Sequence, residues 1–166
     1  MLTQDDIQAL GEDIQDPYQA LAEFMAAFGA SLDPRLWIKL VDEELNELYA
    51  EVPNTQEHLK ELADLLYVYT GLDLVSHDYM GELMPEAERN KSIKLLGRAE
   101  RALSEYVEYY GEEKLARAFT RVHLSNMSKL DDEGKPIKRD DGKVMKGPNY
   151  KAPDLSDLVP RKKEIH

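Results

Sequence analysis

Two stretches of the chain, Leu40-Val41-Asp42-Glu43-Glu44-Leu45-Asn46-Glu47-Leu48 and Glu61-Leu62-Ala63-Asp64-Leu65-Leu66, combine apolar residues at helical spacing with paired carboxylates. The paired residues are Glu44 with Glu47 and Glu61 with Asp64. Residues three apart lie on one face of a helix, so each pair can direct two carboxylates at one point. Ionised carboxylates beside a core are costly unless they are paired or bind a metal. The pattern predicts an oxygen-ligand site for Mg²⁺ or Mn²⁺, and the alternative is two solvated helix faces.

Start and stop signals divide most of the chain into helices. Asp16-Pro17 and Asp33-Pro34 each place an N-cap residue before a proline in the first turn. We expect helices from about 17 to 28, 34 to 52, 55 to 80 and 85 to 110, and a fifth that carries Leu115, Phe119 and Val122 on one stripe. Asn54 and Glu57 are a possible capping box for the third. The fold class predicted is all-α, a helical bundle of about five helices.

The chain changes character after Ser128, where Gly and Pro cluster and helical periodicity ends. Asp140-Asp141-Gly142 between two short β-prone runs predicts a small hairpin. Residues 129–151 carry seven basic and five acidic residues, although the whole chain has a net charge of −12. We therefore divide the chain into an all-α domain, 1–128, and a basic, irregular C-terminal arm, 129–166, that packs on the active site and is mobile without ligand.

Composition narrows the function classes. A net charge of −12 argues against a nucleic-acid binder that uses a general basic surface, and against adhesion to anionic membranes. Without cysteine the chain has no disulfide, thiolate zinc site or cysteine nucleophile. We expect no signal peptide and no membrane span, hence a cytoplasmic protein.

A carboxylate cluster that binds Mg²⁺ suits a polyphosphate substrate, because metal ions neutralise phosphate oxygens. The chain has no P-loop motif, so other groups must bind the phosphates. The candidates are Asn126, Lys129, Lys143 and Lys146. Glu43 is a candidate catalytic base or a second-shell group, with a solvated glutamate as the alternative. Trp37 is a candidate for stacking on a nucleobase, with a core residue as the alternative.

Four strings of residues resemble a known family. Glu43-Glu44-x-x-Glu47 and, after thirteen intervening residues, Glu61-x-x-Asp64 resemble the all-α nucleoside triphosphate pyrophosphohydrolases of the MazG/HisE superfamily. Ser125-Asn126-Met127-Ser128-Lys129, the stretch 141–154 (DGKVMKGPNYKAPD) and Phe24-Met25-Ala26-Ala27-Phe28-Gly29 resemble the phage-type MazG-like members. The resemblance covers most of the chain, but residues 81–110 do not match it.

The resemblance implies hydrolysis of a (d)NTP to a (d)NMP and pyrophosphate. It implies Mg²⁺ held by Glu44, Glu47, Glu61 and Asp64. Glu43 and Glu44 are our own candidates for catalytic residues. The resemblance further implies a homo-oligomer, a dimer or tetramer, and host cytoplasm if a phage encodes the protein. A deoxynucleotide is expected, with a lean toward a purine such as dGTP. The rival hypotheses are a non-catalytic helical interaction protein and a nucleic-acid-binding module that uses the basic arm.

Overall fold

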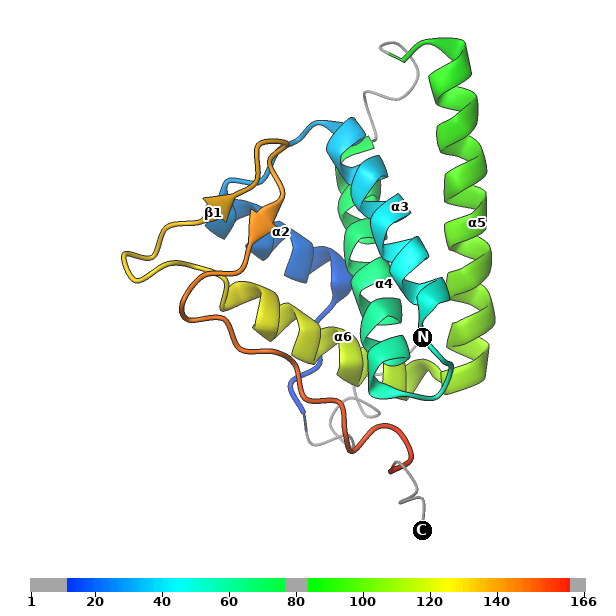
Figure 1. The fold of residues 1–166 in the computed structure, drawn as a ribbon, viewed down its shortest axis with the longest axis vertical. Coiled ribbons are helices and arrows are strands. Elements are labelled where there is room, and N and C mark those ends of the chain that lie inside the picture. Colours follow the sequence, from blue (N-terminus) through cyan, green and yellow to red (C-terminus); the bar gives the residue numbers. More distant parts are fainter. Residues whose placement is uncertain (1–11, 77–83, 162–166) are drawn as a thin grey trace.

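The computed structural model describes residues 12–76 and 84–161, and within them the protein is all-α with one small hairpin (Figure 1). This confirms the predicted fold class. The helices are α2 (Pro17–Phe28), α3 (Pro34–Ala50), α4 (Gln56–Ser76), α5 (Glu86–Tyr110) and α6 (Glu112–Met127). The strands are β1 (Ile137–Lys138) and β2 (Val144–Met145). No helix in the described ranges has the length and apolarity needed to cross a membrane.

The helix boundaries follow the capping signals read from the sequence. Asp16 accepts a hydrogen bond from the Gln19 amide at α2, and Asp33 accepts one from the Arg35 amide at α3. These carboxylates satisfy amides that have no partner inside the helix. Gly29 ends α2 at φ 55°, a left-handed conformation that glycine adopts without a steric penalty.

The predicted capping box at the start of α4 is wrong by one position. The Thr55 hydroxyl, and not Asn54, accepts the hydrogen bond from the His58 amide, at 3.2 Å. Asn54 instead turns the chain at φ 67°, which asparagine tolerates better than threonine. Asn54 therefore forms the tight turn after α3, and Thr55, the next residue, caps α4. The predicted break at 81–85 lies mostly outside the described residues.

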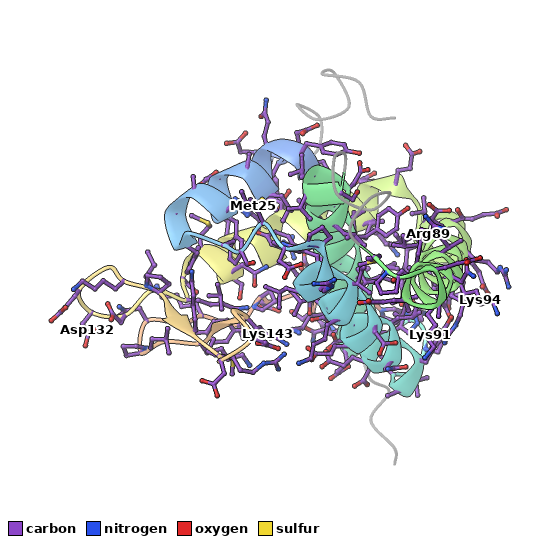
Figure 2. The ribbon with its side chains drawn as sticks, turned by 90° about the horizontal axis from the view of Figure 1, so that it is seen from above. Met25, Arg89, Lys91, Lys94, Asp132 and Lys143 are labelled. Carbon is purple, nitrogen blue, oxygen red and sulfur yellow. The ribbon has the colours of Figure 1, made fainter. Side chains whose placement is uncertain are left out.

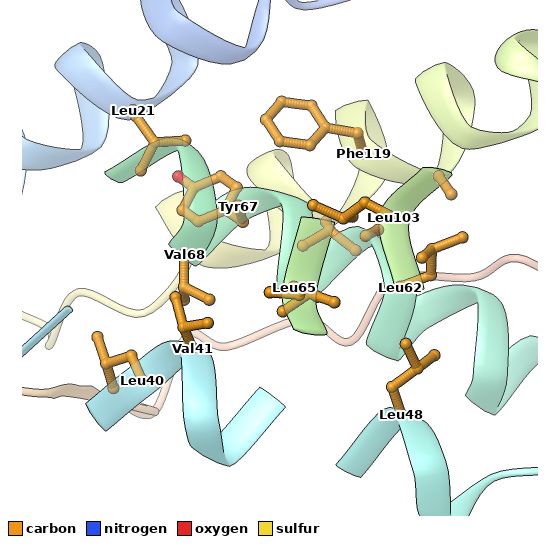
Figure 3. Packing of buried hydrophobic residues seen from close by; sticks show 14 of the residues in the cluster. Leu21, Leu40, Val41, Leu48, Leu62, Leu65, Tyr67, Val68, Leu103 and Phe119 are labelled. Atoms are coloured by element: carbon orange, nitrogen blue, oxygen red, sulfur yellow. The ribbon is translucent and has the colours of Figure 1, made fainter. Parts of the chain in front are cut away.

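The core is centred on the antiparallel pair α3 and α4, with α2 and α6 on one side and α5 along the other (Figure 1). Leu45, Leu62 and Leu65 are fully buried between these layers. Figure 3 shows this packing around Leu65, with Val41 of α3 below and Phe119 of α6 above. The bundle fixes the relative positions of the acidic faces of α3 and α4.

The segment after α6 is anchored more firmly than its polar sequence suggests. It forms the β1–β2 hairpin beside α2 and α3 and then runs back along α6 (Figure 1). Its apolar side chains Val144, Leu155 and Leu158 are buried in the core. Gly142 closes the hairpin turn at φ 97°. Three buried apolar side chains thus hold the arm against the helices.

Candidate active site

Three carboxylates from two helices converge beside the core. Glu44 belongs to α3, and Glu61 and Asp64 belong to α4. One oxygen from each carboxylate lies within 4.8 Å of the others, a spacing that could hold a metal ion. The convergence follows from sequence, because Glu44 lies on the buried stripe of α3 that faces α4.

Two oxygens of this carboxylate cluster lack the partners that buried polar atoms normally have. Oε2 of Glu44 and Oε2 of Glu61 are buried and accept no hydrogen bond from any described residue. Glu44 itself is only 9% exposed. A buried acceptor without a partner costs about 1–3 kcal/mol, more when it is charged. These two oxygens are therefore the atoms that a bound cation would satisfy.

Burial and mutual repulsion raise the pKa values of two carboxylates in the cluster. Burial, followed by repulsion from Asp64, Glu47 and Glu61, raises the pKa of Glu44 to about 10. Burial and repulsion from Asp64 raise the pKa of Glu61 to about 7. Both shifts show that the protein supplies too little positive charge for these carboxylates to ionise freely.

Lys60 is the cation closest to the cluster, and the sequence analysis did not single it out. Its Nζ lies 2.8 Å from Oδ2 of Asp64 and 3.4 Å from Oε1 of Glu61. Burial alone would lower the pKa of Lys60, but the attraction of Asp64 outweighs it and the pKa is raised. The i, i+4 spacing of Lys60 and Asp64 was the signal available in the sequence.

Glu47, the fourth predicted ligand, lies at the edge of the cluster. Its negative charge is close enough to Glu44 and Glu61 to contribute to their raised pKa values. Glu47 is exposed, so it lies outside the compact group of three. The chemistry of the donors, all oxygens with two lacking partners, fits a hard divalent cation.

The cluster borders a cleft of about 430 Å³ that has a charged lining and an apolar lining. The charged lining comprises Glu44, Glu47, Lys60, Asp64, Lys129, Lys143 and Lys146. The apolar lining includes Phe24, Leu36, Trp37, Leu40, Val68 and Val144. A cleft of this kind suits a ligand that joins a charged group to a flat apolar one.

Trp37 is both a core residue and a wall of the cleft. It is 2% exposed, and its Nε1 donates to the Ser31 carbonyl at 2.8 Å. Its ring lies against Gly71 of α4, where an added Cβ would meet Cζ3 of the ring at 2.2 Å. The buried ring agrees with the core alternative, and stacking of Trp37 on a nucleobase stays a prediction.

The S-N-M-S-K string joins the arm to α6. The Ser125 hydroxyl donates to the Lys151 carbonyl at 2.6 Å, and the Ser128 hydroxyl accepts from the Lys151 amide at 2.9 Å. Asn126 and Lys129, between and after these serines, line the cleft. Burial lowers the pKa of Lys129, opposed by the attraction of Asp64.

The hairpin brings basic side chains to the cleft, but one of them is already paired. Lys143 donates to Oε2 of Glu43 at 3.0 Å, and Arg139 donates to Oε1 of Glu43 at 3.0 Å. Burial favours the neutral form of Glu43, yet these bonds outweigh it and lower the pKa. Lys146 lies 4.8 Å from the centre of the Tyr150 ring. Figure 2 shows Lys143 on the side of the hairpin nearest the helices.

Comparisons with known proteins give one similar structure. No protein-family model and no curated protein matches the chain. A crystal structure of a putative NTP pyrophosphohydrolase from Exiguobacterium sp. 255-15 is similar over 88% of this chain and 95% of that one. The identity is 23% and the TM-score 0.43. The function proposed below therefore rests on the geometry of the cleft.

Proposed function

We propose that the protein is a metal-dependent nucleoside triphosphate pyrophosphohydrolase that converts a (d)NTP to a (d)NMP and pyrophosphate. The observation that carries the proposal is the pair of buried, unpartnered oxygens on Glu44 and Glu61, at a cleft with both lysine and aromatic lining. A bound cation would stabilise the unpartnered carboxylate oxygens, and the lysines close by can bind an anion. A polyphosphate with its divalent metal supplies both.

Mg²⁺ is the proposed cation, with Mn²⁺ as a substitute, because the donors are all oxygens. Glu44, Glu61 and Asp64 would hold it, with Glu47 beside them. When bound, such an ion neutralises phosphate oxygens and lowers the pKa of a water molecule. We propose no thiolate or imidazole ligand.

The remaining residues of the cleft have roles that follow from their contacts. Lys129 and Lys146 line the cleft and are assigned to phosphate oxygens, where a lysine acts as a point charge. Glu43 is assigned to holding Lys143 at the cleft rim, since its ionised form is already hydrogen-bonded to that lysine. The aromatic lining, including Trp37, is assigned to the nucleobase. The arm, residues 129–161, thus covers the phosphate part of the substrate.

A screen of the common ribo- and deoxynucleoside triphosphates with Mg²⁺ tests the proposal. Chromatography should show monophosphate and pyrophosphate as products, with activity abolished by a chelator. Glu108→Gln, which removes an exposed carboxylate of α5, is the matched control for Glu44→Gln. Release of a nucleoside diphosphate and inorganic phosphate would contradict the proposed function, as would the absence of turnover with every nucleotide.

A further inference from the structure

Lys60 lies one helical turn before Asp64 on α4, and its ammonium group joins two carboxylates of the cluster. Nζ of Lys60 donates to Oδ2 of Asp64 at 2.8 Å and to Oε1 of Glu61 at 3.4 Å. The side chains of Glu61 and Asp64 are 13% and 17% exposed, whereas that of Lys60 is 35% exposed. One half-exposed cation of the chain is thus shared by two carboxylates that we assign to the metal.

This shared ammonium group satisfies only part of the cluster. Oε1 of Glu61 is paired with Lys60, but Oε2 of Glu61 and Oε2 of Glu44 accept no hydrogen bond from any described residue. A divalent cation held by Glu44, Glu61 and Asp64 comes close to the ammonium group of Lys60. Because two positive charges repel strongly at short range in a partly buried site, Lys60 and the cation compete for the same carboxylates.

Lys60 can leave these carboxylates and still remain in the cleft. A lysine carries a compact charge on a flexible four-carbon stem, so its ammonium group moves at little cost. Lys60 lines the same cleft as Lys129 and Lys146. Since the backbone of Lys60 is fixed in α4, an ammonium group that is displaced from Asp64 stays in the charged lining of the cleft. Oxygens of a bound polyphosphate are the acceptors that suit it there.

We propose that Lys60 is an internal counter-ion that competes with the divalent cation for Asp64 and Glu61 and, once displaced, donates to a phosphate oxygen of the substrate. The inference rests on the proposed function and adds a substrate-binding residue to Lys129 and Lys146. It predicts that removal of the Lys60 charge changes the binding of metal and of phosphate in opposite directions. A lysine that only supports the fold would not do so.

The first test measures the binding of Mg²⁺ alone to the whole protein by calorimetry, with Mn²⁺ as a second probe. Lys60→Met should bind Mg²⁺ about fivefold more tightly than the unsubstituted protein, as expected for the loss of a competing ion pair. Lys60→Arg keeps the positive charge and should bind Mg²⁺ no more tightly than the unsubstituted protein. If Lys60→Met does not fold, Lys60→Gln, which also removes the charge, takes its place.

Two other lysines supply matched controls for the metal measurement. Lys129 lines the same cleft but forms no salt bridge with a described carboxylate, and Lys114 is exposed on α6. Lys129→Met should raise the affinity for Mg²⁺ less than Lys60→Met does, and Lys114→Met should leave it unchanged. Equal gains in Lys60→Met and Lys129→Met would show a general effect of charge and overturn the proposed competition.

The second test measures the binding of inorganic tripolyphosphate at saturating Mg²⁺. Lys60→Met should weaken this binding about tenfold, because a charge-assisted hydrogen bond to a phosphate oxygen is lost. Lys60→Arg should retain most of the affinity, since a guanidinium group also binds phosphate. Weaker Mg²⁺ binding in Lys60→Met, or unchanged tripolyphosphate binding, overturns the proposal.

The outcomes separate this proposal from the proposed function. If Mg²⁺ binds and nucleotides are hydrolysed, but Lys60→Met gains no affinity for Mg²⁺, only the role of Lys60 is overturned. If the two opposite changes are found but no nucleotide is hydrolysed, the proposed function fails and the role of Lys60 stands. If the unsubstituted protein binds neither Mg²⁺ nor Mn²⁺, both fail together, because Lys60 then has no cation to compete with.

Discussion

Two consecutive glutamates of α3, Glu43 and Glu44, lie in surroundings of opposite charge. Glu43 lies among basic side chains, and Glu44 lies among other carboxylates. Glu43 faces the hairpin, where Lys143 and Arg139 donate to both of its oxygens and its pKa is lowered. Glu44 faces α4, where burial and three further carboxylates raise its pKa to about 10. The hairpin supplies a cation to each oxygen of Glu43, whereas in the carboxylate cluster Lys60 pairs with Asp64 and Glu61, and no described salt bridge reaches Glu44.

The direction of the pKa shift therefore separates a completed contact from an incomplete one. A carboxylate with a lowered pKa is paired with cations of the same chain, and this pairing stabilises the fold. A carboxylate with a raised pKa and an unpartnered oxygen is held at a cost, which is typical of functional sites. Lys60 offsets part of that cost at Asp64. Glu44 is deeper in the protein, and the positive charge of Lys60 stabilises its ionised form less.

The largest effect is expected on turnover. Glu44→Gln or Glu61→Gln should lower kcat on the order of a thousandfold, because each removes a charged ligand of the proposed metal. Glu43→Gln should cost far less, since it only loosens Lys143 and Arg139. Steady-state kinetics on the best substrate measures the difference, with circular dichroism as the check on folding. Full activity in Glu44→Gln would remove Glu44 from the site.

The next effect is stabilisation by the cation. Mg²⁺ at about one hundred times its Kd should add about 2.7 kcal/mol to the free energy of unfolding. For a chain of this size that corresponds to a rise in Tm of about 5–10 °C. Glu44→Gln should abolish the rise and Glu43→Gln should retain it. Loss of the rise in both variants would mean that the surroundings of Glu43 and Glu44 are not independent.

Stability of the metal-free protein should depend on pH. The folded protein keeps a proton on Glu61 up to about pH 7 and on Glu44 up to about pH 10, whereas an unfolded glutamate releases it near 4.5. Because the folded state binds more protons in this interval, stability should fall as pH rises through it. Urea unfolding with a chelator, from about pH 5 to about pH 9, measures the slope.

The pH dependence also has an internal control. Saturating Mg²⁺ should flatten the slope, because the cation replaces the protons of the cluster. Glu43 has the opposite shift, so its contribution is present above 4.5 and is lost as pH falls below that value. Stability that rises between about pH 6 and about pH 9 without metal would show that the cluster is neutralised in another way.

The smallest effect is expected at the hairpin contact. Glu43→Gln or Lys143→Ala should lower the free energy of unfolding by about 1 kcal/mol or less, because the pair is partly exposed. Asp42→Asn, an exposed neighbour on α3, should change it less. Urea unfolding of the three variants gives the comparison. A loss several times larger would show that the hairpin holds the bundle together.

The sequence predicted the helices well because their signals are local. An N-cap aspartate followed by proline needs no knowledge of distant residues, and the hairpin turn at Gly142 is likewise local. The carboxylates were located for a similar reason: Glu44 lies on the apolar stripe of its own helix. Their role as metal ligands remains a prediction.

Contacts that depend on tertiary placement could not be predicted. Leu155 and Leu158 lie in a short segment between two prolines, too short for a pattern that would predict their burial against the helices. The pairing of Glu43 with Lys143 joins residues one hundred positions apart. His123 and Tyr67 lie on two separate helices, and only the packing of α4 on α6 brings them together.

Gly71 controls the position of one wall of the cleft. Any side chain at this position must displace the Trp37 ring, and that ring forms a wall of the cleft. Under the proposed function, the missing side chain of one residue on α4 would set how much room a nucleobase finds beside α3. A residue that touches no ligand would then be the place where a larger or smaller base is admitted, and Gly71→Ala is a minimal way to re-size the cleft.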